Sequence, residues 1–336
     1  MRPVQPVQPG GRVVCVGDVM LDISAALPGP LVMGSDTPAP ISFCHGGSAA
    51  NTAAWLASAG VPCVFAGRVG DDPFGRDAVA ALRSHGVITA VSIDPDTATG
   101  VCLVLVDPDG ERTMVPSAGA NATLSATDLG DDLLGAEDHL HLSGYTLLSE
   151  GSRPAALFAL RLASSVGASV SVDAASAGPI RAVGAQRFLD WIPAGALLLA
   201  NADELAALTG ALDAGDPHAG SAALDTGSAA QDADSLDQDT GSAAQDAGIA
   251  ALVARQLTVV LKCGSGGSVL ATAAGIWRSA AEPVEVLDST GAGDAFAAGL
   301  LAALGNGAQL NDALAEGNRL GAAAVGKLGA RPSMPS

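Results

Sequence analysis

The sequence predicts an α/β protein whose helices pack on a largely parallel sheet. Along its 336 residues, short apolar runs typical of buried strands alternate with longer helical stretches. This alternation is typical of βαβ units. Two Gly-rich segments, residues 46–60 and 287–299, open predicted helices. Because ligands in such folds bind at the carboxyl ends of the strands, these segments are the first candidates for a binding site.

The individual elements follow from local hydrophobic patterns. Strands are expected at residues 13–16, 63–66, 139–142, 169–172, 197–200, 258–261 and 284–286. Helices are expected at residues 49–59, 74–84, 154–165, 202–208 and 293–303. The hydrophobic residues make up 49% of the chain, which is enough for a sizeable core. Only 3% of the residues are aromatic, so this core is expected to consist mainly of Ala, Val and Leu.

Two segments interrupt the alternation. Residues 21–43 carry no helix signal, and residues 100–116 read as a hairpin around the turn Asp107-Pro-Asp-Gly110. Together they predict a small antiparallel sheet outside the main layer. The pattern leaves two interpretations open, a lid over a cleft and a surface sheet without a role in binding.

A third segment, residues 210–248, has a different composition. It is rich in Ala, Gly, Ser, Asp and Gln, contains no Lys or Arg, and repeats the nonapeptide 225–233 at 239–247. Such a sequence buries too little apolar surface to offset the entropy cost of ordering. We expect a low-complexity, disordered insert without a catalytic role.

The overall charge and the cysteines exclude several classes of protein. A formal net charge of −19 argues against nucleic acid and anionic membrane surfaces as partners. It permits a nucleotide, because a metal ion and backbone amides can hold phosphates. The five cysteines are scattered and suggest neither a disulfide framework nor a zinc site. Neither a signal peptide nor an apolar run long enough for a membrane span is apparent, so a cytoplasmic protein is expected.

The segment 287–299 carries the strongest chemical signal. Gly291 and Gly293 allow a tight turn before the predicted helix, whose first amides, from Ala292 to Asp294, would face a ligand. Free amides at a helix N-terminus bind phosphate without a basic side chain. Asp294 would then lie beside a transferring phosphoryl group as a proton acceptor. A Gly-rich turn with a helix-capping Asp explains the same spacing equally well.

Two other nucleotide-binding motifs are absent from the sequence. A Walker A loop needs Gly-Lys followed by Ser or Thr, but the only lysines, Lys262 and Lys327, precede Cys263 and Leu328. A dinucleotide fingerprint needs a third Gly and a place after the first strand. The segment starting at Gly291 has neither, which disfavours a Rossmann dehydrogenase.

The segments 46–60 and 288–299, in this order and with a predicted lid between them, resemble the two signatures of the ribokinase-like (pfkB) carbohydrate kinase family. The resemblance covers nearly the whole chain apart from the insert. It implies one ribokinase-like kinase domain, 11–333, with a three-layer α/β/α fold, a mostly parallel central sheet and a small β lid. The lid segments would be about 21–43 and 98–118.

The resemblance also implies roles for individual residues. Asp294 matches the catalytic base, and Gly291, Ala292 and Gly293 match the anion hole. The substrate-binding positions match Asp22, Gly46, Gly47 and Asn51. The nucleotide-binding positions match Asn201, Glu204, Lys262, Gly264, Gly267 and Asn318, with Glu204 acting on Mg²⁺ indirectly. A monovalent-cation site matches Asp288, Thr290, Gly329 and Ser333. The implied cofactors are ATP, Mg²⁺ and K⁺.

Departures from the family pattern bear on the substrate. Many sugar kinases of this family have Lys after the Gly pair, whereas this chain has Ser48, so a phosphorylated substrate lacks an expected cation. The sequence therefore favours ATP-dependent phosphorylation of a hydroxyl on a small unphosphorylated sugar. Phe43 is the one clear aromatic residue of the predicted lid, which disfavours the alternative, an adenosine-type nucleoside kinase. A non-catalytic sugar or nucleotide sensor is the third interpretation. Family lids also imply a homodimer through the lid.

Overall fold

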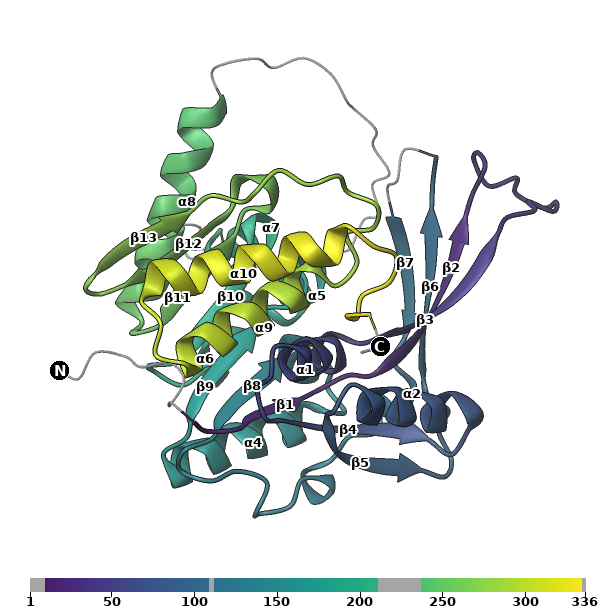
Figure 1. Ribbon diagram of the computed structural model, residues 1–336, viewed down its shortest axis with the longest axis horizontal. Helices are drawn as coiled ribbons and strands as arrows, with labels where there is room; N and C mark the ends of the chain where they lie inside the picture. The colour runs from purple at the N-terminus through teal and green to yellow at the C-terminus, as the bar shows by residue number, and fades with distance from the viewer. Residues whose placement is uncertain (1–9, 109–111, 211–236, 334–336) are drawn as a thin grey trace.

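The computed structural model describes residues 10–108, 112–210 and 237–333, in which nine strands form a large central sheet (Figure 1). In spatial order these strands are β13 (Gly275–Ser279), β12 (Ser268–Thr272), β11 (Thr258–Lys262), β10 (Leu197–Asn201), β9 (Ser169–Asp173), β8 (His139–Ser143), β1 (Val13–Val16), β4 (Cys63–Gly70) and β5 (Ile88–Asp94). The strands from β11 to β5 are parallel, and β12 and β13 are antiparallel to their neighbours. The predicted mostly parallel sheet is confirmed.

Helices cover both faces of this sheet, as a parallel sheet requires. Alternate residues of β1 point into two separate cores. One core is covered by α1 (Ser48–Ser58), α2 (Pro73–Ser84), α9 (Ala292–Gly305) and α10 (Leu310–Val325). The other is covered by α4 (Arg153–Val166), α5 (Ala177–Val183), α6 (Ala185–Trp191), α7 (Ala202–Thr209) and α8 (Asp237–Ala254). The three-layer α/β/α architecture is therefore confirmed. None of the described helices combines the length and apolar character needed to cross a bilayer.

A second sheet stands at one side of the central sheet (Figure 1). Its order is β3 (Ile41–Gly46), β2 (Met20–Ala26), β6 (Gly100–Val106) and β7 (Arg112–Ser117), so its strands come from the two predicted lid segments. The β6–β7 hairpin is antiparallel as expected. The sheet as a whole is mixed, because β2 and β6 pair in parallel. Each of them leaves the central sheet after one of its parallel strands, so both run in the same direction.

The prediction of a disordered insert at residues 210–248 is partly wrong. Residues 237–248, including the second copy of the nonapeptide, belong to α8. Ala is the strongest helix former, and Ile249 and Leu252 anchor the end of α8 in the core. The remaining part of the insert, residues 211–236, lies outside the described residues, as does the tip of the β6–β7 hairpin, residues 109–111.

The strand expected at residues 284–286 is also wrong. This stretch has no regular structure, and Val284 and Val286 are exposed. The amides of Leu287 and Asp288 instead donate to the carbonyl of Val325 at the end of α10. The apolar run therefore approaches the Gly-rich turn along α10 rather than within the sheet.

Candidate active site

A pocket of about 760 Å³ lies where the carboxyl ends of the parallel strands meet the second sheet. One wall is formed by residues that follow strands of the central sheet and by the start of α1 and α9. The opposite wall comes from β2, β6 and β7 of the second sheet. The polar residues that line the pocket are Asp18, Asp22, Ser48, Asn51, Asn121, Tyr145, Thr146, Ser149, Ser152, Asp173, Ser176, Asn201, Glu204, Lys262, Thr290 and Asp294. This location is the usual ligand site of an open α/β sheet.

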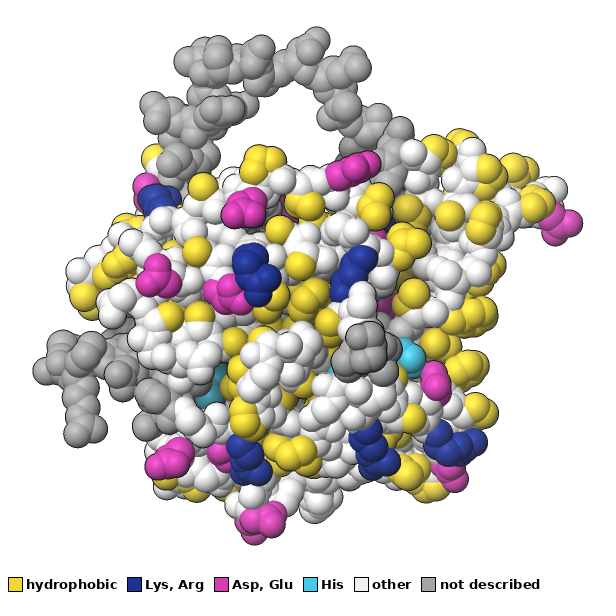
Figure 2. Space-filling model, in the orientation of Figure 1, with side chains coloured by type: hydrophobic (Ala, Val, Ile, Leu, Met, Phe, Trp, Pro, Cys, Tyr) yellow, Lys and Arg dark blue, Asp and Glu magenta, His cyan; other side chains and the backbone are white. Residues whose placement is uncertain are grey.

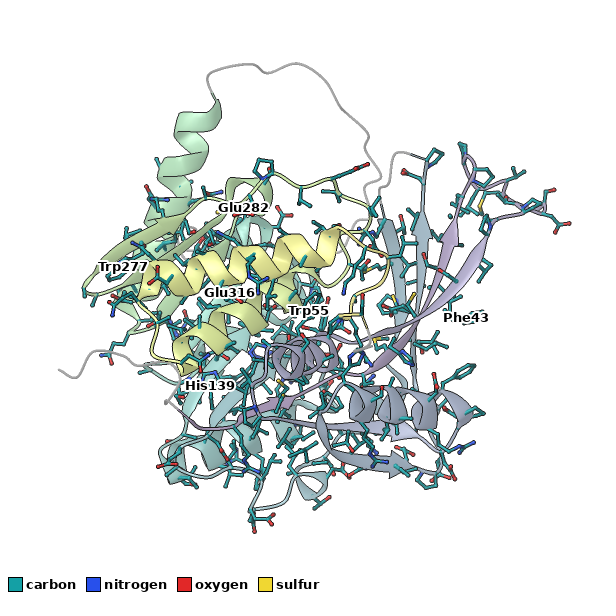
Figure 3. All side chains as sticks on the ribbon, viewed as in Figure 1. Phe43, Trp55, His139, Trp277, Glu282 and Glu316 are labelled. Carbon is teal, nitrogen blue, oxygen red and sulfur yellow. The ribbon has the colours of Figure 1, made fainter. Side chains whose placement is uncertain are left out.

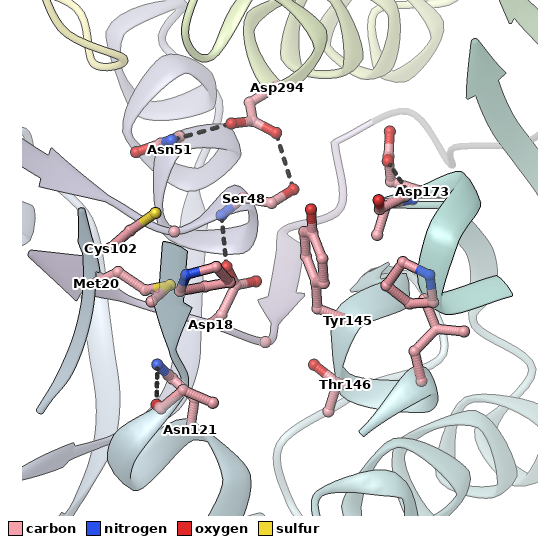
Figure 4. A pocket seen from close by; sticks show the side chains of 18 of the residues that line it. Asp18, Met20, Ser48, Asn51, Cys102, Asn121, Tyr145, Thr146, Asp173 and Asp294 are labelled. Carbon is pink, nitrogen blue, oxygen red and sulfur yellow. Dashed lines mark hydrogen bonds between the residues drawn. The ribbon is translucent and has the colours of Figure 1, made fainter. Parts of the chain in front are cut away.

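Asp294 lines the pocket, where its carboxylate lies next to the side chains of Ser48 and Asn51 (Figure 4). It occupies the first turn of α9, which begins after Gly291 in the left-handed region at φ 75°. Two side chains from the first turn of α1 bind its carboxylate. The Ser48 hydroxyl donates to Oδ1 at 2.8 Å, and the Asn51 amide donates to Oδ2 at 3.0 Å. The two Gly-rich segments of the sequence therefore meet at this carboxylate.

The environment of Asp294 gives it a near-neutral pKa. Desolvation of the carboxyl raises its pKa to about 7, against the hydrogen bonds from Asn51 and Ser48, which lower it. The nearby carboxylate of Asp173 raises the pKa further, and Lys262 lowers it. A carboxylate with such a pKa accepts a proton far more readily at neutral pH than an exposed one. It therefore suits general base catalysis.

The turn before α1 requires glycine. Gly47 has φ 94°, and a Cβ atom there would lie 2.5 Å from the carbonyl oxygen of Asp18. Gly46 lies against the carboxylate of Asp22 and does not itself line the pocket. Burial raises the pKa of Asp22 to about 6, since the nearby charge of Arg331 only partly compensates. Both glycines thus allow α1 to start close against the loop after β1 and against β2.

Asp18 is a pocket residue that sequence reasoning missed. Its Oδ2 accepts the amide of Ser48 at 2.9 Å, and its Oδ1 is buried without a hydrogen-bond partner among the described residues. Its position directly after the first strand, in Gly17-Asp18, was a usable signal. Asn121 was also missed, and its side chain hydrogen-bonds both the amide and the carbonyl of Val19. Asp18 therefore offers a free acceptor to a ligand.

Across the pocket, the predicted nucleotide residues form a charged group. Lys262 Nζ lies 2.7 Å from Asp173 Oδ2. Burial lowers the pKa of Lys262, but Asp173 and Glu204 outweigh this effect and the pKa is raised. Asp173 had no sequence signal beyond its place at the end of a strand. The Lys262 side chain also lies 3.2 Å from the position that a Cβ on Gly293 would take. The cation therefore stands beside the N-terminus of α9.

Asn201 and Glu204 form a reciprocal cap at the start of α7. The Glu204 amide donates to Asn201 Oδ1, and the Asn201 amide donates to Glu204 Oε2, both at 2.8 Å. This pair therefore caps α7, and both residues also line the pocket. Among the residues described, no cluster of three or more His, Cys, Asp or Glu side chains forms a metal site. A single carboxylate, that of Glu204, can nevertheless serve a Mg²⁺ site, because this ion usually keeps several of its waters and also binds the nucleotide phosphates.

The other predicted nucleotide residues lie outside the pocket lining. The Asn318 amide donates to the carbonyls of Ser279 and Ala280, at 3.0 and 3.2 Å. Gly267, at φ 88°, packs against the same carbonyl of Ser279. Gly264 lies in the same turn between β11 and β12. These residues are therefore brought together around the end of β13, on the Lys262 side of the pocket.

The four residues of the predicted monovalent-cation site do not present a free carboxylate. Asp288 Oδ1 accepts from the amide and hydroxyl of Thr290, at 2.9 and 2.6 Å, and lies 3.2 Å from Arg112. Its Oδ2 accepts the amide of Gly329 at 2.9 Å, and Ser333 is exposed. The side chains as they stand do not fit K⁺, because donors and a guanidinium already surround Asp288.

The turn that is predicted to bind an anion presents fewer of its residues to the pocket than expected. Gly291 and Gly293 line the pocket, whereas Ala292 does not. The Ala292 amide donates to the carbonyl of Ser289 at 3.3 Å. The amides of Gly293 and Asp294, in the first turn of α9, have no partner within the helix. They are the groups that can bind an anion beside the Asp294 carboxylate.

A proton acceptor of near-neutral pKa next to an anion-binding helix N-terminus suits one class of enzyme, a phosphotransferase that acts on the hydroxyl of a small molecule. The sequence matches the pfkB family of carbohydrate kinases over residues 11–336, and the chain belongs to this family. An ATP-dependent ribose-1-phosphate kinase from Halopiger xanaduensis is 32% identical over 287 residues, which cover 85% of this chain and 82% of that protein.

Solved structures agree with this assignment. Adenosine kinase from Sinorhizobium meliloti has the same fold, with a TM-score of 0.79 at 24% identity and coverage of 96% of both chains. A fructokinase from Vibrio cholerae O395, solved with fructose, ADP and calcium bound, has a TM-score of 0.71 at 26% identity, covering 97% of this chain and 96% of that one. The chain is thus a carbohydrate kinase of the ribokinase fold. ATP and a divalent metal ion are the cofactors that these relatives support.

Proposed function

We propose that the chain transfers the γ-phosphoryl group of ATP to a hydroxyl of a small uncharged sugar, with Asp294 as the base. The observation that carries this proposal is the fixed carboxylate of Asp294. Ser48 and Asn51 hold its two oxygens at the pocket wall, and its pKa is near neutral. A base held in this way needs little reorganisation when the substrate hydroxyl arrives.

The reaction follows from the groups around the pocket. Asp18, Asp22 and Asn51 accept or donate hydrogen bonds to sugar hydroxyls and orient one of them toward Asp294. The carboxylate takes the proton of this hydroxyl while the hydroxyl oxygen forms the new bond to the γ-phosphorus. The bond between the γ-phosphorus and the oxygen of ADP breaks at the same time. The free amides at the start of α9 stabilise the charge on the transferring group. Mg²⁺, held through water by Glu204 and Asn201, would neutralise phosphate charge when bound.

The charges of the pocket support an unphosphorylated substrate. Lys262 is the only Lys or Arg among the described lining residues, and it is paired with Asp173. The substrate side carries the carboxyl groups of Asp18, Asp22 and Asp294 instead. A phosphate group already present on the sugar would be repelled by these carboxylates. The related protein from Halopiger xanaduensis is named for a phosphorylated sugar, so this chain would differ from it in substrate.

A nucleoside is the second candidate, because part of the pocket wall is apolar. Met20, Cys102, Met114 and Pro116 of the second sheet line it, and Figure 4 shows Met20 and Cys102 opposite Tyr145 across the pocket. A base could pack between these surfaces. The sequence had offered Phe43 as the lid aromatic residue, but Phe43 is 65% exposed and does not line the pocket.

A coupled ADP-release assay with MgATP tests these candidates. The panel contains free pentoses and hexoses, nucleosides, and phosphorylated sugars including ribose 1-phosphate. We expect kcat/KM for one neutral sugar to exceed that for its phosphorylated form by roughly 10-fold or more, about 1.4 kcal/mol of discrimination. Turnover confined to ribose 1-phosphate would contradict the proposal, and turnover confined to nucleosides would select the second candidate. ATP binding without turnover on any acceptor would favour a sensor.

The same assay tests whether K⁺ affects the reaction. Parallel runs in K⁺ and Na⁺ ask whether backbone carbonyls near Asp288 support the K⁺ effect that the resemblance implies.

The five cysteines are free thiols, as expected in a reducing compartment. Together with the need for ATP, they support a cytoplasmic location for the reaction.

We further propose that two copies pair through the outer face of the second sheet, the lid. Asp22, Cys102 and Pro116, which line the pocket, alternate with residues that point the other way. The large apolar residues exposed on that outer face are Ile41, Phe43, Leu103 and Val115. Hydrophobic side chains gather along the side of the molecule where β2 and β3 lie (Figure 2). Sheet faces this apolar are usually covered by a partner.

Charge substitution on this face tests the pairing. Phe43→Glu with Leu103→Glu should raise the dimer Kd by roughly 30-fold or more, since hot-spot losses reach about 2 kcal/mol. Sedimentation velocity measures this change. Ile276→Glu is the matched control, because Ile276 on β13 has an exposed fraction between those of Phe43 and Leu103, and it should leave the Kd unchanged. A wild-type protein that stays monomeric at high micromolar concentration would refute the pairing.

A further inference from the structure

Arg331 lies directly behind the Asp294 site. It follows α10 in the segment 327–333, and only 8% of it is exposed. Its Nε donates to Asn51 Oδ1 at 3.2 Å, and its Nη2 donates to the carbonyl of Gly46 at 3.0 Å. The Asn51 amide nitrogen then donates to Asp294 Oδ2 at 3.0 Å. One carboxamide therefore connects the guanidinium to the carboxylate.

This arrangement fixes the orientation of the Asn51 side chain. A carboxamide has an acceptor on one side and a donor on the other. The guanidinium can only donate, so it selects the orientation in which Asn51 Oδ1 faces Arg331. The amide nitrogen then faces Asp294. Without the guanidinium, the opposite orientation would bring an oxygen against the carboxylate and lose a hydrogen bond that lowers the pKa of Asp294.

The segment that carries Arg331 is itself held on three sides. The indole of Trp55, a residue of α1 that is labelled in Figure 3, donates to the Ala330 carbonyl at 2.9 Å. The Gly329 amide donates to Asp288, and Ala330 packs against Gly291. The ammonium of Lys327 lies 4.3 Å from the Trp55 ring centroid. The guanidinium is therefore presented to Asn51 by a fixed backbone.

We propose that Arg331 is a positioning residue that orients Asn51 and, through Asn51, the carboxylate of Asp294. This inference rests on the proposed role of Asp294 as the base. Arg331 lies outside both Gly-rich segments, and it does not line the pocket. It can therefore act on the reaction through Asn51, which it binds, and through its charge, which interacts with Asp22 and Asp294.

The pH dependence of turnover reports on this role. The titratable groups that interact with Asp294 are Asp173 on β9, Lys262 on β11, Tyr145 on the short helix α3 (Gly144–Leu148), Cys15 on β1 and Arg331. Removing the guanidinium takes away a positive charge and leaves the Asn51 amide, the donor to Asp294, less firmly held. Both changes favour the protonated carboxyl, so its pKa should rise. The acidic limb of kcat/KM, expected near pH 7 from Asp294, should move to higher pH.

The experiment compares Arg331→Gln and Arg331→Lys with the wild type. Arg331→Gln should lower kcat/KM roughly 10- to 100-fold, because small misplacements of a catalytic group have effects of this size, and should move the acidic limb upward. Arg331→Lys keeps the charge but not the two-pronged donor, so both effects should be smaller. Arg319→Gln is the matched control, because Arg319 is exposed on α10 and its hydrogen-bond partner among the described residues is Glu316, outside the pocket. It should leave the rate and the profile unchanged.

A double-mutant cycle separates positioning from a general loss of structure. In an Asn51→Ala background, Arg331→Gln should cause a much smaller further loss of kcat/KM than in the wild type, since the contact to Asn51 is already absent and only the effect of the charge on Asp294 is left. Additive losses, or a wild-type pH profile in Arg331→Gln and Arg331→Lys, would overturn the inference. Asp294→Asn in the same series keeps the two proposals apart. High activity of Asp294→Asn would refute the base, whereas an inactive Asp294→Asn with a wild-type Arg331→Gln would refute only the positioning role.

Discussion

Asp294→Asn should lower kcat by about 10²- to 10⁴-fold, the range that general base catalysis contributes. KM for the sugar should change far less, because the substituted side chain has nearly the same shape and the sugar keeps its other contacts. The loss falls on kcat because the proton acceptor acts only as the hydroxyl attacks. Initial rates of ADP release over a range of sugar concentrations separate the two constants.

Ser48→Ala is the companion variant for this prediction. It removes the hydrogen bond to Asp294 Oδ1 but leaves the base in place. Because this hydrogen bond lowers the pKa of Asp294, its loss should raise the pKa and reduce activity at neutral pH and below, while activity well above the raised pKa is kept. Near-wild-type turnover in Asp294→Asn would mean that phosphoryl transfer proceeds without this carboxylate. In that case another group of the pocket must accept the proton.

Gly291→Ala should lower both the activity and the stability of the protein. Gly291 has φ 75°, and a Cβ atom there would lie 2.6 Å from the carbonyl oxygen of Ala330. The turn must shift to relieve this contact, which moves the amides of Gly293 and Asp294. Loss of such preorganised donors typically lowers kcat by about 10²- to 10³-fold. The strained backbone should also cost about 1–3 kcal/mol of unfolding free energy.

Gly307→Ala is the matched control for the backbone conformation. Gly307, just beyond the end of α9, has nearly the same φ, 76°, but a Cβ atom there would meet nothing within 4 Å. It should lose only about 1 kcal/mol of stability through the left-handed conformation and keep full activity. Thermal unfolding and kcat of both variants test the comparison. Equal effects on both would show that the contact between Gly291 and Ala330 is unimportant.

Much of the fold could be predicted because its signals are local. Short apolar runs predicted the buried strands β1, β8 and β10, and the glycines before α1 and α9 marked the starts of both helices that meet at Asp294. Other short apolar runs were misleading. Residues 284–286 look like a strand, but whether a strand forms depends on a neighbour to pair with, and the chain instead follows α10. The helix over 237–248 escaped detection because its anchor, Ile249 and Leu252, lies beyond the repeat.

The site was harder to predict where it depends on distant partners. Glycine turns and the carboxylate of Asp294 are visible as short motifs. The ion pair between Lys262 and Asp173 joins residues 89 positions apart. The contact between Arg331 and Asn51 spans 280 positions. No pattern in a single sequence links such residues, so their roles emerge only once the tertiary contacts are known.

The meeting of α1 and α9 has a consequence for protein synthesis. Ser48 and Asp294 are 246 positions apart, and Arg331 is made later still. The two halves of the reaction centre therefore leave the ribosome at very different times. A nascent chain can present the loops proposed to bind the sugar early, yet it lacks Asp294, the proposed base, until α9 has been translated and docked. Chains released before residue 294 would therefore lack the carboxylate that we propose as the base, and they should have no sugar kinase activity.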